Sequence, residues 1–465
     1  MNYDQFIESK SQLSGNFGFD PIWIPDFLFD FQKYAVKWAL KKGRFAGFFD
    51  CGLGKSPMAL VCAENVIRKT NGRFLFIMPL AVCPQMKREA DKFGIEVHIS
   101  RDGKLPTESK IILTNYEKIH LFNSTDFIGA ACDESSIIKN FDGQYKEQIT
   151  EFMRTLKYRH LWTATPSPND YIELGTTSEC LGDLGYMDML GRFFKNSQNS
   201  LHPSVYRNKG KLFQRIDDGA KWRFRGHAER DFWRWVCSWA KACRKPSDLG
   251  FSDNDFILPP LNIREHVVKS TSPNPDFLFD MPAVSLDEQR KERRRTLRER
   301  CELAASFHSV RSGQSVAWCF LNDEGDMLEE MIPDCVQVAG KDSDEEKEEK
   351  FEAFRSGQAK RMVTKGDIAG FGINWQFADY FTYFPNHSFE LWYQCVRRLW
   401  RFGQKNTVSA DVIISEGEIR VLENLKRKSD AAELMFSKLV ALMNNEMQIK
   451  TVNKAVNNQQ NPLWL

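Results

Sequence analysis

The chain has 465 residues, of which 42% are hydrophobic and 27% charged, so it is long enough for two or three domains that each bury a core. Its 64 Lys and Arg residues nearly balance 62 Asp and Glu residues, which leaves a formal net charge of +2 and excludes a strongly basic protein. No apolar run approaches the ~20 residues of a membrane-spanning helix, and the first residues do not fit a secretory signal. Eleven cysteines without a Cys-x-x-Cys pair favour reduced thiols in a cytosol-like compartment.

The first element with a chemical signature lies near the start of the chain. A strand-like run at 45–49 leads into Gly52-Leu53-Gly54-Lys55-Ser56, and a helical pattern follows. Glycines allow backbone N–H groups to wrap a phosphate, the lysine offsets phosphate charge, and the serine hydroxyl is placed for Mg²⁺. The full phosphate-loop pattern has glycine at position 49, where this chain has Phe. The motif alone therefore leaves an ordinary glycine turn open.

Two later strands end in residues that suit the same chemistry. The buried run 127–132 ends in Asp133-Glu134-Ser135-Ser136. In phosphate-loop enzymes, one carboxylate at such a strand end holds Mg²⁺, and the next can orient the attacking water. We therefore expect Asp133 to bind the metal and Glu134 to position the water. The run 158–162 ends in Thr163-Ala164-Thr165-Pro166, which an ordinary strand exit would also explain.

Two segments in the middle of the chain are rich in basic residues and have competing interpretations. The stretch 171–258 interleaves basic and aromatic residues, among them Lys221, Arg223 and Arg225, which suits nucleic-acid contact or an amphipathic helical insertion equally. The segment 287–300 carries seven basic and four acidic residues on an expected helix. Such a run is usually a solvated face, and contact with DNA is the alternative.

A second signature lies near the end of the chain. Residues 394–404 read Gln-Cys-Val-Arg-Arg-Leu-Trp-Arg-Phe-Gly-Gln, an arginine-bearing helix. Arginines supplied from a distant segment stabilise the charge that develops on a transferred phosphoryl group. We expect Arg398 and Arg401 to reach the phosphates held by Lys55. A nucleotide held in this way would couple hydrolysis to the relative movement of two lobes.

Strand-like runs alternate with helical periodicity twice along the chain. The first set lies at 45–49, 73–78, 110–114, 127–132 and 158–162, and the second at 315–320, 335–338, 360–364, 380–384 and 408–414. This alternation predicts an α/β fold with parallel sheets flanked by helices. We expect an N-terminal lobe at 1–269 with a helical insertion at 171–258, a C-terminal lobe at 270–430, and a helix with a polar tail at 431–465.

Over about residues 29–414, these motifs resemble the helicase superfamily-two ATPases, specifically their Swi/Snf-type branch. The matching segments, in family order, are 50–56 (motif I), 74–79 with Gln85 (motif Ia), 113–117 (motif Ib), 133–136 (motif II), 163–166 (motif III), 316–320 (motif IV), 365–374 (motif V) and 394–404 (motif VI). The resemblance implies two tandem RecA-like lobes with a helical insertion. It also implies a DNA-dependent ATPase that uses ATP and Mg²⁺.

The resemblance assigns a role to individual residues. The catalytic residues it implies are Lys55, Asp133, Glu134, Arg398 and Arg401, with Ser56 and Asp133 as Mg²⁺ ligands. The ATP-binding residues it implies are Gln32, Gly52, Leu53, Gly54, Lys55, Ser56, Gly372 and Gln394. Gln32 occupies the place where the family has a glutamine that reads adenine.

The function that the resemblance implies is translocation along duplex or branched DNA. Two alternatives stay open: a helicase that separates DNA or RNA strands, and an ATP-switched module that binds branched or replicating DNA. Motif II reads Asp-Glu-Ser-Ser rather than Asp-Glu-Ala-His or Asp-Glu-Gly-His, which keeps both carboxylates but puts the coupling between motifs II and III in question. The short chain resembles compact forms carried by bacteriophages, so we expect a cytoplasmic monomer.

Overall fold

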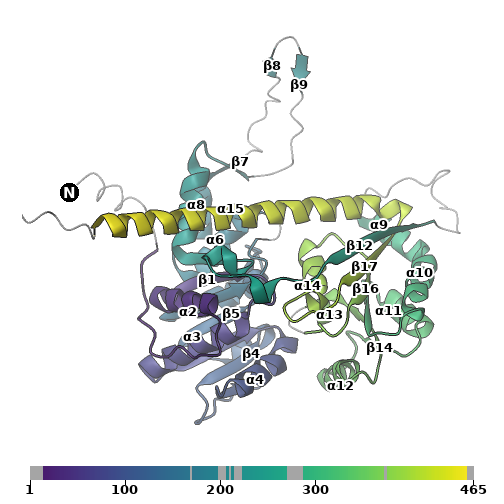
Figure 1. Ribbon diagram of the computed structural model, residues 1–465, viewed down its shortest axis with the longest axis horizontal. Coiled ribbons are helices and arrows are strands. Elements are labelled where there is room, and N and C mark those ends of the chain that lie inside the picture. The colour runs from purple at the N-terminus through teal and green to yellow at the C-terminus, as the bar shows by residue number, and fades with distance from the viewer. Residues whose placement is uncertain are drawn as a thin grey trace, which may run out of the picture.

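Two parallel sheets, each flanked by helices, form two lobes that lie side by side (Figure 1). The structure is a computed structural model, and it describes residues 14–167, 170–196, 206–208, 211–213, 222–269, 286–370 and 374–457. The expected fold class, an α/β chain with two tandem RecA-like lobes, is confirmed.

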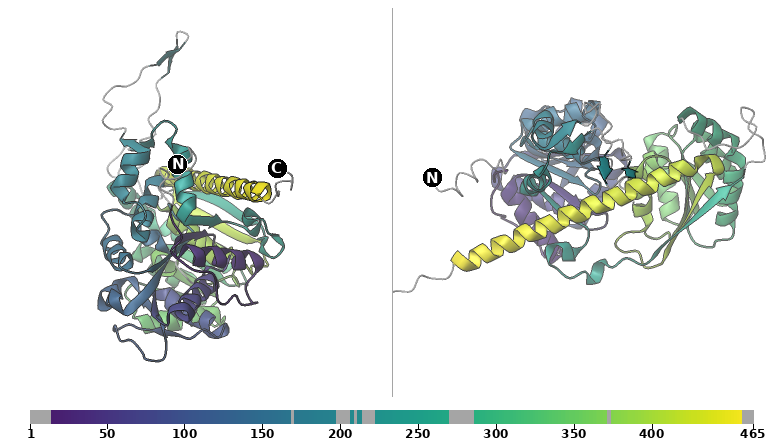
Figure 2. Two further views of the ribbon diagram at one scale, coloured as in Figure 1. Left: turned by 90° about the vertical axis from the view of Figure 1, so that its left-hand side faces the viewer. Right: turned by 90° about the horizontal axis from the view of Figure 1, so that it is seen from above.

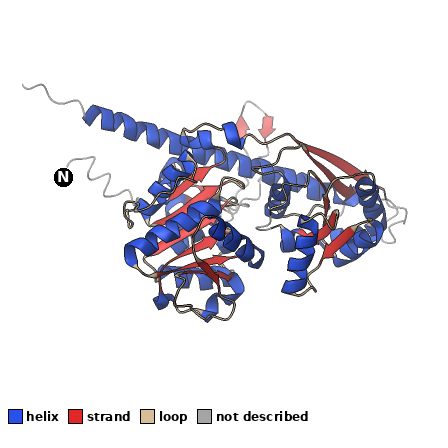
Figure 3. Ribbon diagram, turned by 60° about the horizontal axis from the view of Figure 1, so that its bottom comes forward, coloured by secondary structure: helices blue, strands red, loops and turns tan. Residues whose placement is uncertain are grey.

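The first lobe is built on a seven-stranded sheet with the order β11-β1-β6-β5-β2-β4-β3. Its strands are β1 (Arg44–Phe49), β2 (Arg73–Met78), β3 (Val97–Ile99), β4 (Ile111–Asn115), β5 (Phe127–Asp133), β6 (Tyr158–Thr163) and β11 (Ala240–Cys243). Its helices are α2 (Asp30–Lys42), α3 (Lys55–Thr70), α4 (Cys83–Lys92), α5 (Gln144–Arg154), α6 (Leu174–Leu181), α7 (Tyr186–Phe193) and α8 (Ala228–Trp239). Because helices cover the sheet, its central strands are apolar and buried almost end to end (Figure 3).

The second lobe has a six-stranded parallel sheet with the order β12-β17-β16-β13-β15-β14. Its strands are β12 (Leu261–Val268), β13 (Ser315–Cys319), β14 (Cys335–Val338), β15 (Arg361–Lys365), β16 (Tyr380–Tyr383) and β17 (Val408–Ser415). Its helices are α9 (Leu286–Arg295), α10 (Leu297–Ser309), α11 (Asn322–Met331), α12 (Asp344–Arg355), α13 (Gly366–Ala369) and α14 (Phe389–Leu399). Two short antiparallel pairs, β7 (Phe194–Asn196) with β10 (Trp222–Phe224) and β8 (Tyr206–Asn208) with β9 (Lys211–Phe213), project from the first lobe.

Two strands differ from the expected division of the chain. Strand β12, which we had placed in the first lobe, pairs along its whole length with β17 of the second sheet. Strand β11 lies inside the stretch expected to be a helical insertion, yet it pairs with β1 and completes the first sheet. Both were missed because β12 is half polar and largely exposed, and β11 has only four residues.

The aromatic residues of α8, in the 171–258 stretch, belong to the core of the first lobe. Trp233, Trp235 and Trp239 on α8 are buried there. Arg225 is exposed beside them, and its Nε donates to the Phe194 carbonyl at 2.6 Å. Lys221 lies outside the described residues. On α8 the aromatic residues therefore form the buried face of an amphipathic helix.

One long helix, α15 (Ile419–Asn457), runs across both lobes (Figure 2). It begins well before the expected boundary at 431. Leu422 and Leu425 pack into the core of the second lobe, while Met435 and Leu439 are among the residues that pack into the core of the first. Neither α15 nor any other helix among the described residues is both long and apolar enough to cross a membrane.

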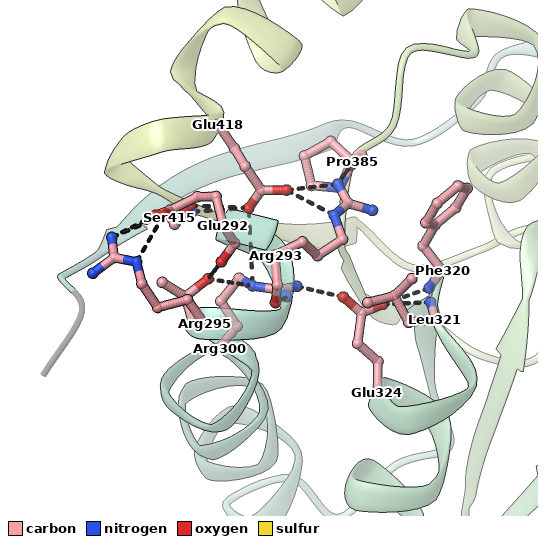
Figure 4. Close-up of polar contacts among 11 residues, drawn as sticks. Glu292, Arg293, Arg295, Arg300, Phe320, Leu321, Glu324, Pro385, Ser415 and Glu418 are labelled. Carbon is pink, nitrogen blue, oxygen red and sulfur yellow. Dashed lines mark hydrogen bonds and ion pairs between the residues drawn. The ribbon is translucent and has the colours of Figure 1, made fainter. Parts of the chain in front are cut away.

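The charged segment 287–300 has an exposed face, as its composition suggested, and also a buried face that its composition did not indicate. The Arg300 side chain is fully buried and pairs with the equally buried Glu324 at 2.7 Å, and Arg293 pairs with Glu418 at 2.7 Å (Figure 4). Glu324 also accepts the backbone N–H groups of Phe320 and Leu321. Because removing one partner of such a buried pair costs about 3–5 kcal/mol, this network fixes α9 and α10 to the start of α15.

The buried His160 makes stability depend on pH. Its ring lies in the sheet between Phe45 and Phe74, with centroids 4.6 and 5.2 Å away, and neither ring nitrogen has a partner among the described residues. Burial lowers its pKa to about 3, so the folded protein keeps the ring neutral where the unfolded chain, with a pKa near 6.5, takes up a proton. Stability from this group is therefore complete above about pH 6.5 and is lost as the pH falls towards 3.

Between pH 7 and pH 5 the parent should lose about 2 kcal/mol of unfolding free energy through His160, since each pKa unit corresponds to about 1.4 kcal/mol. We predict that His160→Phe does not show this loss. Urea unfolding at both pH values measures the difference. The exposed His120 provides the control, because His120→Asn should leave the pH dependence as it is. An unaltered pH dependence in His160→Phe would mean that the ring is not held neutral.

Candidate active site

A cavity of about 320 Å³ lies between the lobes, at the carboxyl ends of β1 and β5. The first lobe lines it with Cys51, Gly52, Gly54, Lys55, Ser56, Pro57, Val82, Gln85, Glu89, Lys92, Phe93, Asp133 and Glu134. The second lobe lines it with Asn374, Gln376, Arg398, Arg401 and Phe402. The structure thus brings eight of the residues predicted for the site to one cavity: Gly52, Gly54, Lys55, Ser56, Asp133, Glu134, Arg398 and Arg401.

The phosphate-loop sequence forms the expected connection between a strand and a helix. It follows β1, and α3 begins at Lys55. Gly52 and Gly54 have φ angles of +88° and +77°, a region that other residues rarely adopt. The Lys55 ammonium donates to the Phe49 carbonyl at 3.0 Å, which holds it over the loop. Because Lys55 and Ser56 line the cavity, the positive end of the α3 dipole faces it, as an anion site requires.

Two carboxylates occupy the opposite wall. Burial, followed by the neighbouring Glu134 carboxylate, raises the pKa of Asp133 to about 7, while the Lys55 ammonium opposes this rise. Glu134 has a left-handed backbone, with φ of +48°. The Thr163 hydroxyl lies 3.4 Å from Glu134 Oε2, so the strand end of β6 contacts the same carboxylate.

Two of the residues that line the cavity, Ser56 and Asp133, suit a Mg²⁺ ion. The half-buried Asp133 carboxyl and the Ser56 hydroxyl are hard oxygen donors that line one cavity. No cluster of three or more His, Cys, Asp or Glu side chains suited to a metal exists among the described residues. Mg²⁺ usually takes only one or two ligands from the protein, because it keeps several waters and binds substrate phosphates directly.

The arginines reach the cavity from α14 and the turn that follows it. Arg398 donates to Gln394 Oε1 at 2.8 Å, and Gln394 Nε2 lies 3.5 Å from Glu134 Oε2 in the first lobe. Arg401 donates to the side-chain oxygen of Asn374. Burial, together with the charge of Arg398, lowers the pKa of Arg401 to about 10. Two guanidinium groups thus share a buried site, which favours an anionic ligand between them.

Three of the predicted residues that the structure describes are not part of the cavity wall. Gln32 is buried behind the loop, where its amide donates to the Leu53 carbonyl at 2.9 Å and accepts the Phe29 N–H at 3.0 Å. Both ends of this amide are bonded to backbone, so Gln32 supports the loop from behind. Leu53 and Gln394 are also buried behind the wall. Gly372 lies outside the described residues.

A buried ion pair that sequence reasoning missed joins the two lobes. Arg397 on α14 pairs with Asp50, at the end of β1, and the Tyr393 hydroxyl donates to the same carboxylate. Glu390, one turn before Tyr393 on the same helix, pairs with Lys139 of the first lobe. A helix that presents acidic, aromatic and basic residues at three- and four-residue spacing was the one available signal.

Comparisons with known proteins agree with the fold. No protein-family model and no curated protein sequence matches the chain. The Swi2/Snf2 ATPase core of Sulfolobus solfataricus in complex with double-stranded DNA is 18% identical, with a TM-score of 0.41, over 92% of this chain and 96% of that one. S. cerevisiae Dbp5 bound to RNA and ADP–BeF₃ is 10% identical, with a TM-score of 0.53, over 88% of this chain and 93% of that one. The likeness to the second structure shows a shared fold of two RecA-like lobes.

The close approach of Phe402 to the phosphate loop generates a prediction for Gly52. A Cβ atom built there would lie 2.7 Å from the Phe402 backbone nitrogen. Gly52→Ala should therefore push the lobes apart, and it should destabilise the fold by the left-handed strain of about 1–2 kcal/mol plus the cost of this clash. Gly94 has φ of +67° and no neighbour within 4 Å, so Gly94→Ala should show the strain alone.

Urea unfolding and small-angle X-ray scattering measure the two effects for both variants. We expect the larger loss of stability and the larger radius of gyration in Gly52→Ala. Equal values in the two variants would mean that Phe402 does not approach the loop in solution.

Proposed function

We propose that the chain is an ATP-dependent motor of the Swi/Snf type in helicase superfamily two, which couples ATP hydrolysis to movement along duplex DNA. One observation carries the proposal: a phosphate loop and two carboxylates from the first lobe share a cavity with two arginines from the second. If only one lobe contacted the nucleotide, hydrolysis would not change the contact between the lobes. Because Arg398 and Arg401 belong to the other lobe, loss of the γ-phosphate weakens the contact between the lobes.

In the proposed mechanism, Lys55 and the N-terminus of α3 hold the β- and γ-phosphates. Ser56 and Asp133 hold Mg²⁺, which offsets charge on the phosphate oxygens when it is bound. The Glu134 carboxylate orients the attacking water, and Thr163 keeps that carboxylate in place. Arg398 and Arg401 stabilise charge that develops in the transition state, a contribution that is typically about 10³-fold or more in turnover.

A second, larger hollow between the lobes is the candidate nucleic-acid groove. Its volume is about 1310 Å³, and the segments that resemble motifs Ia and Ib line it together with α12. The first lobe contributes Arg88, Lys92 and Lys139 together with Glu89, Glu117 and Glu134, whereas α12 contributes Asp344, Glu348, Glu349 and Glu352 together with Lys347 and Arg355. The charges of the first-lobe wall are balanced, and the excess of carboxylates on α12 would repel a phosphate backbone. The proposal therefore requires α12 to move away from the first lobe when DNA binds.

The phosphate loop gives the most direct prediction. Lys55→Ala should lower ATP turnover by at least about 10³-fold while the protein stays folded, because the ammonium offsets charge on the γ-phosphate. Glu134→Gln should bind ATP with parent-like affinity and fail to hydrolyse it, because Asp133 and Lys55 remain. Turnover is measured by phosphate release and affinity by a fluorescent ATP analogue. Parent-like turnover in a folded Lys55→Ala protein would exclude the proposed function.

The nucleic-acid substrate is tested by turnover with single-stranded, duplex and forked DNA and with RNA. We expect stimulation by duplex DNA, displacement of a triplex strand and no separation of the duplex. Strand separation would favour a helicase instead. Binding of forked DNA that depends on ATP, without stimulated turnover, would favour a switched binding module.

If Arg223 and Arg225 contact phosphates, replacing both by Ala should reduce the log–log salt slope of binding by about 0.9 for each lost contact.

A further inference from the structure

The buried group formed by Asp50, Tyr393 and Arg397 links the two lobes directly beside the candidate active site. Asp50 follows β1, two residues before Gly52, and only 7% of its surface is exposed. The Arg397 guanidinium pairs with Asp50 Oδ2, and the Tyr393 hydroxyl donates to Oδ1. The Cys51 backbone N–H donates to the same Oδ1 at 2.6 Å. One carboxylate thus ties the loop to two residues of α14.

The surroundings of Arg397 are built for a charge. Its guanidinium donates to the Trp400 carbonyl at 3.3 Å and lies over the Trp400 ring at 4.5 Å. Burial alone would lower the pKa of Arg397, but the carboxylate of Asp50 outweighs burial and raises it above the usual value. A buried arginine paired in this way loses its partner if the lobes separate, so the pair exists only while the lobes are together.

Arg397 is also placed to orient the arginines that face the cavity. It lies on α14 immediately before Arg398 and four residues before Arg401, which both line the cavity, whereas Arg397 does not. Successive helical residues point about 100° apart, so a helix whose Arg397 is fixed to the first lobe must turn Arg398 in one defined direction. The Gln394 amide, which holds Arg398 and reaches Glu134, lies one turn earlier on the same helix.

We propose that Asp50, Tyr393 and Arg397 form an interlobe latch that sets the position of Arg398 and Arg401 at the phosphates without contacting the nucleotide. The inference rests on the proposed ATPase function and assigns Arg397 as a positioning residue. Its effect belongs to the closed state, in which all reacting groups meet. Loss of the latch should therefore lower turnover much more than nucleotide binding, because an error of about 1 Å in a catalytic group can cost about 10²-fold.

The test is a double-mutant cycle on ATP turnover and nucleotide affinity. We expect Arg397→Met and Asp50→Asn each to lower kcat by about 10²-fold. The double variant should show about the same loss rather than about 10⁴-fold, because both changes remove one interaction. The nucleotide affinity of Asp50→Asn and of the double variant should stay within about threefold of the parent. Arg397→Lys should restore part of the rate, since it keeps the charge without the planar fork.

Arg298→Met is the matched control, because Arg298 forms an exposed pair with Glu302 at 2.7 Å on the same lobe. Its turnover should equal that of the parent. Losses that multiply in the double variant, or a parent-like kcat in Arg397→Met, would overturn the latch. In either case hydrolysis by the parent would still support the proposed ATPase.

Closure of the lobes can be followed without hydrolysis. Dyes on Lys69→Cys in α3 and Glu330→Cys in α11 report the distance between the lobes by energy transfer, since both positions are exposed. With a non-hydrolysable ATP analogue, Arg397→Met should show a smaller closed population than the parent and than Arg298→Met. An unchanged closed population would contradict the latch. An absence of turnover in the parent would contradict the proposed function but leave this measurement valid.

Discussion

A single helix buried in two cores is the constraint on which the arrangement of the lobes depends. Leu422 and Leu425 of α15 are part of the second core, and Met435 and Leu439 are part of the first. Between these anchors, residues 426–434 contain no buried side chain. A helix keeps its length, at about 1.5 Å per residue, so α15 does not act as a flexible linker. The helix therefore fixes the distance between its anchor points in the two cores.

The same constraint explains how charged groups can lie buried between the lobes. Buried ion pairs are often no more stable than apolar contacts, because both charges lose their hydration. In this protein they lie at a boundary where a strong attraction that breaks on movement is an advantage. Asp50 with Arg397 and Lys139 with Glu390 both join the first lobe to α14. The interface is therefore sensitive to small rotations, and the candidate active site lies directly beside it.

The sequence predicted what depends on local pattern and missed what depends on tertiary approach. All ten expected strands exist, with ends within one residue, because apolar runs between helical segments are typical of parallel sheets. Strand β12 was assigned to the wrong lobe, because its alternation does not show which sheet it joins. The buried face of the charge run 287–300 was missed, because a pattern of charges does not show that Arg300 meets Glu324 across a helix pair. The converging residues of the site were predicted from spacing and family resemblance, whereas the partner of Arg397 could be found only from the folded chain.

The unusual Asp-Glu-Ser-Ser segment raised the question of how the carboxylates communicate with the rest of the molecule. Its serines are buried, and the contacts to Glu134 come from elsewhere. Thr163 approaches Glu134 Oε2 from the neighbouring strand at 3.4 Å, and Gln394 approaches the same oxygen from the second lobe at 3.5 Å. Both contacts are long, and because Gln394 lies on α14, a small shift of this helix strengthens or breaks its contact with Glu134. Because Gln394 of the second lobe contacts Glu134 directly, the link between this lobe and the carboxylate does not depend on a histidine in motif II.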